Sequence, residues 1–76
     1  MESKALILAK FGEIVLNEAK KKNMSLRKLA DASGLEYSQV QRIAKGKVNL
    51  ALTTIVALCE GLDSTPSELF HDFKLL

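Results

Sequence analysis

The side chains best suited to binding a ligand lie between residues 37 and 45. If this segment is helical, at 100° per residue, the spacing i, i+3, i+4 and i+7 places four of them on one face. Arg and Gln are the side chains that contact guanine and adenine edges bidentately in the major groove of DNA. The face has cations and hydrogen-bonding groups but no acid, and the alternative to a ligand-binding face is an ordinary solvated helix surface. Its members are Ser38, Gln41, Arg42 and Lys45.

Positive charge is concentrated in the middle of the sequence. Residues 20–47 contain eight Lys or Arg against two acids, whereas the remaining residues contain three lysines against seven acids. The formal net charge of +2 therefore conceals a basic segment in an otherwise acidic chain. Such a segment is the electrostatic pattern of a protein with a polyanionic partner, although a solvated surface can show it too.

Residue types needed for other chemistries are scarce. The single cysteine, Cys59, cannot form an internal disulfide, and the single histidine, His71, cannot hold a metal by itself. A chain of 76 residues is also too short for a deep enzyme cleft. We therefore expect no enzyme activity, no catalytic residues, no metal or other cofactor and no small-molecule ligand. Cys59 is expected to be a core residue, with a reactive thiol as the alternative.

The elements that must position these residues are helices. Proline occurs once, at Pro66, and alternating strand patterns are missing. We predict one all-α domain over residues 1–76, a bundle of five helices. Ser25 is suited to cap the second helix, and Thr65 with Glu68 has the spacing of a capping box for the fifth. The helices are expected over about 4–22, 26–33, 37–45 and 52–62, and from Pro66 onward.

A turn of about three residues, 34–36, separates the second and third expected helices. A short glycine-containing turn between two short helices is typical of a helix-turn-helix, here over about residues 25–45. Gly34 suits a left-handed backbone at the turn, and Ala30 is small where the helices must cross. Six positions have the required small or apolar types, which is more specific than any two of them: Leu29, Ala30, Gly34, Leu35, Val40 and Ile43.

From Phe11 to Phe70, the sequence resembles the Cro/phage-repressor-like (XRE-type) helix-turn-helix family, most clearly over residues 24–30, 34–40 and 43–47. The resemblance implies a five-helix DNA-binding domain of the lambda-repressor type. It also implies a transcriptional regulator, such as a repressor, that binds double-stranded DNA as a homodimer on paired half-sites. The residues that fall at base-contacting positions are Tyr37, Ser38, Gln41 and Arg42. Those at or beside phosphate-contacting positions are Arg27, Lys45 and Lys47.

Three features depart from the family pattern. Leu26 replaces a glutamine that commonly contacts a phosphate, so one anchoring contact is expected to be missing. Glu36 replaces a serine or threonine, and its carboxylate suits the helix dipole but repels a nearby phosphate. Ala19 and Ala44 replace a buried ion pair. Because both charged partners are absent together, no buried charge is left unpaired, and we expect the two alanines to face each other.

The first expected helix has more apolar residues than one buried stripe requires. Leu8, Phe11, Val15 and Ala19 form a stripe that can face the core. Two explanations are open. The protein self-associates through this helix or through the C-terminal segment 73–76, or the domain packs around the helix on several sides. The apolar residues of this helix that lie partly outside the stripe are Leu6, Ile7, Ile14 and Leu16.

The partner and the compartment follow from the same observations. No apolar run approaches the roughly 18 residues of a membrane span, and the N-terminus lacks the pattern of an export signal, so we expect a cytoplasmic protein without membrane contact. Our main hypothesis is a sequence-specific DNA-binding regulator whose third helix enters the major groove. The alternative is a protein-interaction module, an antitoxin-like partner, which would tolerate the loss of Arg42 and Lys45.

Overall fold

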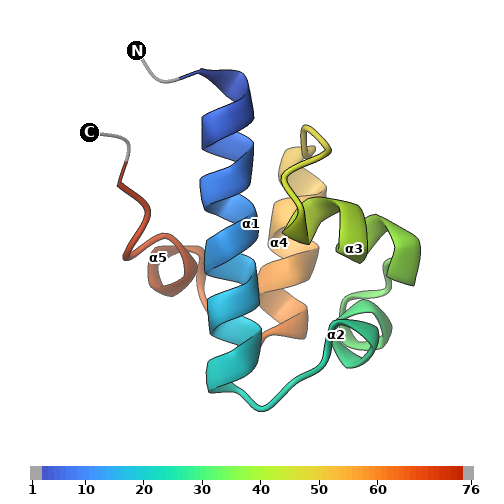
Figure 1. Ribbon diagram of the computed structural model, residues 1–76. Coiled ribbons are helices and arrows are strands. Elements are labelled where there is room, and N and C mark those ends of the chain that lie inside the picture. Colours follow the sequence, from blue (N-terminus) through green and yellow to red (C-terminus); the bar gives the residue numbers. More distant parts are fainter. Residues whose placement is uncertain (1–2, 75–76) are drawn as a thin grey trace.

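The computed structural model describes residues 3–74, which form five α-helices joined by short loops (Figure 1). The predicted all-α class and the order of the helices are confirmed. The expected ends of the first, third and fourth helices lie one residue beyond the observed ends. Residues 1–2 and 75–76 of the predicted domain lie outside the described range. The helices are α1 (Lys4–Lys21), α2 (Leu26–Ser33), α3 (Tyr37–Ala44), α4 (Leu52–Gly61) and α5 (Pro66–Leu69).

Local sequence signals set the ends of α2, α3 and α5. The Ser25 hydroxyl accepts a hydrogen bond from the backbone N–H of Lys28 and starts α2. Thr65 and Glu68 form the predicted capping box at the start of α5. Gly34 has the left-handed φ of 73° that the sequence predicts after α2, and Gly46 has a similar φ of 71° after α3.

The core lies between α1, α2, α3 and α4. In Figure 1, α3 crosses in front of α4 and packs against α1, while α2 packs against both α3 and α4. The four apolar helix positions of the predicted helix-turn-helix are all at most 2% exposed. Burial of these side chains is the main stabilising contribution that fixes α2 and α3 relative to the rest of the domain. The buried members from these two helices are Leu29, Ala30, Val40 and Ile43.

The closest approach between α1 and α3 is at Gly12. A Cβ atom at this position would lie 2.5 Å from the carbonyl oxygen of Ala44 and 2.7 Å from that of Ile43. The sequence predicts that Ala44 meets α1 at Ala19, but the structure places its backbone against Gly12, two turns earlier. The physical reason is that the two backbones can touch only where one residue has no Cβ. Gly12 meets this condition, whereas Ala19, although small, has a Cβ.

The remaining apolar residues of α1 divide between core and surface. Ile14 packs partly against the core, whereas Leu6 and Leu16 are 44% and 40% exposed. On α4, Leu52 is more exposed than either, at 75%, and Val56 is 41% exposed. Within the described residues, no helix is long and apolar enough to cross a membrane.

The C-terminal segment folds back onto α5 and the core. The ring of Phe73 packs edge-on against that of Phe70, with 5.4 Å between their centroids. Phe70 in turn stacks on Phe11 of α1. The last two residues of the segment considered for self-association, 75 and 76, lie outside the described part of the chain.

Candidate DNA-binding interface

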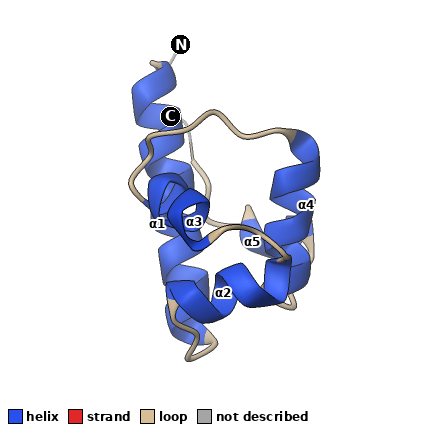
Figure 2. Ribbon diagram, turned by 90° about the vertical axis from the view of Figure 1, so that its right-hand side faces the viewer, coloured by secondary structure: helices blue, strands red, loops and turns tan. Residues whose placement is uncertain are grey.

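α2 and α3 lie together on one side of the molecule, which Figure 2 shows facing the viewer. Val40 and Ile43 anchor α3 to the core, so its opposite face is turned outward. Ser38, Arg42 and Lys45 are exposed on that face, and Gln41 is half-buried beside them. The structure therefore brings together the polar face that the sequence predicts for this helix.

The C-terminal end of α3 is held by backbone hydrogen bonds. The N–H of Lys47 donates to the carbonyl of Arg42 over 2.9 Å, and the N–H of Gly46 donates to that of Ile43 over 3.0 Å. This is the Schellman arrangement, in which a left-handed glycine reverses the chain direction. Lys45 and Lys47 are both exposed on either side of this glycine, at the end of α3.

The N-terminal end of α3 carries a contact that the sequence does not reveal. Tyr37, the first residue of α3, is half-buried and packs partly against the core. The guanidinium carbon of Arg27, in the first turn of α2, lies 4.1 Å from the centroid of the Tyr37 ring. The two residues are on different helices, and no periodicity within one helix could have predicted the contact.

The cations of this surface have no acidic partner among residues 3–74. Among residues 3–74, no carboxylate oxygen lies within 4.0 Å of the charged groups of Arg27, Arg42, Lys45 or Lys47. An unpaired group of exposed cations produces a positive potential that attracts a polyanion. The surface defined by Arg27, Tyr37, Ser38, Gln41, Arg42, Lys45 and Lys47 is called the basic face below.

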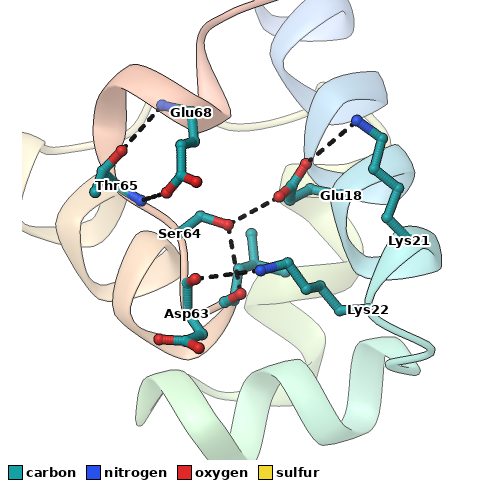
Figure 3. Close-up of polar contacts among 8 residues, drawn as sticks. Glu18, Lys21, Lys22, Asp63, Ser64, Thr65 and Glu68 are labelled. Atoms are coloured by element: carbon teal, nitrogen blue, oxygen red, sulfur yellow. Dashed lines mark hydrogen bonds and ion pairs between the residues drawn. The ribbon is translucent and has the colours of Figure 1, made fainter.

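Two of the lysines at the end of α1, Lys21 and Lys22, contact other residues of the domain. As Figure 3 shows, the Lys22 ammonium donates to the carbonyl of Asp63 over 3.2 Å. Lys21 lies 3.8 Å from a carboxylate oxygen of Glu18. The hydroxyl of Ser64 donates to the other oxygen of Glu18 over 2.8 Å. The contacts of Lys22 and Ser64 connect α1 to the loop between α4 and α5, whereas the ion pair of the exposed Lys21 lies within α1.

Two of the departures from the family pattern, Leu26 and Glu36, lie at the starts of α2 and α3. Glu36 is the N-cap residue of α3, but its side chain makes no capping hydrogen bond and is exposed. Its carboxylate therefore lies at the N-terminal end of α3, next to Tyr37. Leu26 packs against the core, so the position of the missing glutamine serves packing instead of polar contact.

The single cysteine, Cys59, lies in the core. Cys59 is 2% exposed, which confirms it as a core residue. Burial, with the nearby charge of Glu60, raises the pKa of the Cys59 thiol, so the reactive thiolate is disfavoured. No group of three or more His, Cys, Asp or Glu within residues 3–74 is arranged to hold a metal ion.

Comparison with known families identifies the class of the protein. The model of the Cro/C1-type HTH DNA-binding domain matches residues 16–74, more than three quarters of the chain. The chain belongs to this family. It is a DNA-binding domain of transcriptional regulators, and the family is not one of enzymes. No curated protein matches the sequence.

Several solved structures are similar to the chain. The restriction-modification controller protein C.AhdI from Aeromonas hydrophila is 38% identical with a TM-score of 0.79, over 83% of this chain and 96% of that protein. The wild-type controller protein C.Esp1396I is 22% identical with a TM-score of 0.84, over 93% and 90% of the two chains. An HTH_3 family transcriptional regulator from Vibrio cholerae has a TM-score of 0.86 at 18% identity, over 93% of this chain and 40% of its own. The last two similarities establish the fold.

Proposed function

We propose that the protein is a homodimeric transcriptional regulator that binds a specific sequence of double-stranded DNA with α3 in the major groove. Base edges are contacted by Tyr37, Ser38, Gln41 and Arg42. Phosphates are contacted by Arg27, Lys45 and Lys47. The whole chain serves as one DNA-binding domain, with its helix-turn-helix at about residues 25–45.

The observation that carries this proposal is the division of α3 into two faces. Val40 and Ile43 are at most 1% exposed and fix the helix to the core. The outward residues Ser38 and Arg42 make no side-chain hydrogen bond or ion pair with any other described residue. A rigidly held helix whose polar side chains are not used by the fold is what base reading requires, because the contacts must be made to DNA.

Phosphate contacts supply the part of the affinity that does not depend on sequence. Each phosphate neutralised by a lysine or arginine releases condensed counterions, so the affinity falls as the salt concentration rises. Arg27 lies near the N-terminal end of α3, and Lys45 and Lys47 lie at its C-terminal end. Contacts at both ends of the helix would fix its position along the groove, which base contacts alone would not do.

The exposed apolar surface of α4 supports a dimer. Leu52 and Val56 are one helical turn apart, so they share a face, and Leu52 is the most exposed large apolar side chain described. We propose this face as the contact with a second copy, since two copies of one domain read paired half-sites about one turn of DNA apart. The 38% identity to the controller protein from Aeromonas hydrophila favours a controller role, with the genes of a restriction–modification system as the first targets to test.

The test is DNA binding measured by fluorescence anisotropy over a salt series, first on random duplex DNA. We expect an affinity that falls steeply with salt, as several phosphate contacts require. Lys21→Ala is the control for the loss of one positive charge. It removes an exposed lysine that pairs with Glu18 and is not part of the basic face. Its salt dependence should equal that of the wild type.

Absence of binding to duplex DNA at low salt would reject the proposal. The antitoxin-like alternative would then become the main hypothesis. In that case Arg42→Ala together with Lys45→Ala would leave activity intact, whereas changes to the apolar surfaces would abolish it.

A further inference from the structure

The contact between Arg27 and Tyr37 joins the two helix ends that form the N-terminal part of the basic face. Arg27 is the second residue of α2, and Tyr37 is the first residue of α3. With 4.1 Å from the guanidinium carbon to the ring centroid, the geometry is that of a cation–π contact. The contact thus joins a residue expected at a phosphate to a residue expected at a base.

The stability of α2 does not explain an arginine at this position. A positive charge in the first turn of a helix is disfavoured by the helix dipole. No carboxylate within residues 3–74 lies close enough to offset it as an ion pair. The contact recorded for the guanidinium is the face of the Tyr37 ring.

The start of α3 has no side-chain cap, so contacts of the Tyr37 side chain are what hold its first residue in place. Ser25 caps α2 and Thr65 caps α5, but Glu36 makes no capping hydrogen bond to α3. The position of Tyr37 is therefore set by the core beneath its ring and by the guanidinium over it. The Tyr37 hydroxyl forms no hydrogen bond with another described residue, so it is free to contact a ligand.

A stacked guanidinium can still bind a phosphate. The cation–π contact uses the flat face of the group, whereas bidentate binding of a phosphate uses the N–H donors at its edge. Arg27 can therefore make both contacts at once. An ammonium group has no such separation of face and edge, so lysine is not an equivalent residue here.

We propose that Arg27 is a positioning residue for Tyr37, and that the stacked pair couples the phosphate contact of α2 to the base contact at the start of α3. The inference rests on the proposed DNA-binding function and adds to it. Phosphate binding by Arg27 orders the ring, and the ordered ring contacts its base in one orientation. Loss of Arg27 thus weakens sequence reading as well as non-specific attraction.

A double-mutant cycle tests the coupling, on a duplex selected from a random-sequence library and on random duplex DNA. The variants are Arg27→Ala, Tyr37→Leu and the double variant. On the selected duplex, the loss of affinity of the double variant should be about two- to fivefold smaller than the product of the single losses, as a cation–π contact at an exposed site implies. On random DNA the losses should simply multiply, because no specific base contact is made there.

Two further variants make the result specific. Tyr37→Phe keeps the ring on which Arg27 stacks and removes only the hydroxyl, so its cycle with Arg27→Ala should show little coupling. Lys28→Ala removes the neighbouring exposed cation of α2, which has no ring contact, and its loss should multiply with that of Tyr37→Leu. The fluorescence measurement that follows changes only Arg27 or Lys28, so the test does not depend on the folding of Tyr37→Leu.

A second measurement needs no DNA. The chain has one tyrosine and no tryptophan, so its intrinsic fluorescence reports on Tyr37 alone. Arg27→Ala should make this fluorescence more accessible to acrylamide quenching, whereas Lys28→Ala should leave it unchanged.

The outcomes separate this inference from the proposed function. Multiplicative losses on the selected duplex, or unchanged quenching in Arg27→Ala, would overturn the positioning role while leaving DNA binding established. Equal coupling on random DNA would overturn it too, because the ring would then be positioning the arginine. If the wild-type protein bound no duplex at all, the proposed function itself would fail.

Discussion

At the scale of single residues, α3 contains two kinds of exposed polar side chain. Arg42 lies on the outward face in the last turn of α3, where we propose that it contacts a base edge, and Lys45 is the C-cap residue, beside the chain reversal at Gly46. The sequence alone cannot distinguish them, since both are exposed cations of one helix face. Their positions along α3 predict different effects on DNA binding.

Arg42→Ala should lower the affinity for a selected duplex by about 1–3 kcal/mol and broaden the range of sequences accepted, because a bidentate base contact is lost. Lys45→Ala should weaken binding to all duplexes by a similar factor and reduce the salt slope by about 1. Anisotropy on selected and random DNA over a salt series measures both. Identical behaviour of the two variants would contradict the assignment of Arg42 to base reading.

At the scale of elements, the position of α3 depends on its contact with α1. Gly12→Ala would place a methyl group 2.5 Å from the carbonyl oxygen of Ala44, so α3 has to move or the domain loses stability. An alanine inside a helix is otherwise favoured over glycine by roughly 1 kcal/mol. We expect a net loss of about 1–3 kcal/mol in the free energy of unfolding.

Urea unfolding of Gly12→Ala measures this loss, with Asn17→Ala as the control at an exposed position of the same helix. The control should be neutral or slightly stabilising. A stabilised Gly12→Ala variant would show that α1 and α3 are farther apart than the structure has them.

The start of α5 offers a prediction on pH. The backbone N–H of Thr65 donates to the Glu68 carboxylate over 2.7 Å, and the hydrogen bonds with Thr65 lower the pKa of Glu68. A lowered folded-state pKa contributes stability above the unfolded-state value of about 4.3, and this contribution is lost as the pH falls through the folded-state value. An NMR titration of the carboxyl groups should therefore give Glu68 a lower pKa than that of an ordinary glutamate.

Thr65→Ala tests the cause of the shift. The variant removes the hydroxyl that accepts from the Glu68 N–H, so the start of α5 should fray and the pKa of Glu68 should rise toward its ordinary value. The loss of the cap should cost about 0.5–2 kcal/mol of stability. An unchanged Glu68 titration in this variant would show that the capping box is not what lowers the pKa.

At the scale of the whole molecule, charge and apolar surface occupy different places. The unpaired cations gather on α2 and α3, whereas the exposed Leu52 and Val56 lie on α4. A dimer formed through α4 would leave both copies of the basic face available for DNA. Self-association through α1, which the surplus of apolar residues on that helix suggests, would instead use residues such as Leu6.

Val56→Glu should shift sedimentation toward the monomer and reduce the affinity for paired half-sites more than for a single half-site. Leu6→Glu should leave both unchanged, since Leu6 lies on α1 and is exposed to a similar extent, 44% against 41%. The reverse pattern would move the interface to α1. A monomeric wild-type protein at the concentrations where it binds paired half-sites would refute the dimer.

The sequence by itself determined what depends on neighbouring residues. The caps at Ser25 and Thr65, the left-handed glycines at 34 and 46, and the division of α3 into buried and outward faces all follow from spacing within one or two turns. These patterns were sufficient for the helix-turn-helix, for a set of candidate DNA-binding residues and for the helix boundaries to within one residue, because helix periodicity and capping are local effects.

Only the tertiary structure decided which residues of different helices meet. The stacking of Arg27 on Tyr37, the close approach of α3 to Gly12 and the use of Lys22 to hold the loop at Asp63 join positions far apart in the chain or on different helices. Helix periodicity gives the direction of each side chain around its own axis but not the distance or angle between axes. Those are set by packing of the whole core at once, to which every buried side chain contributes.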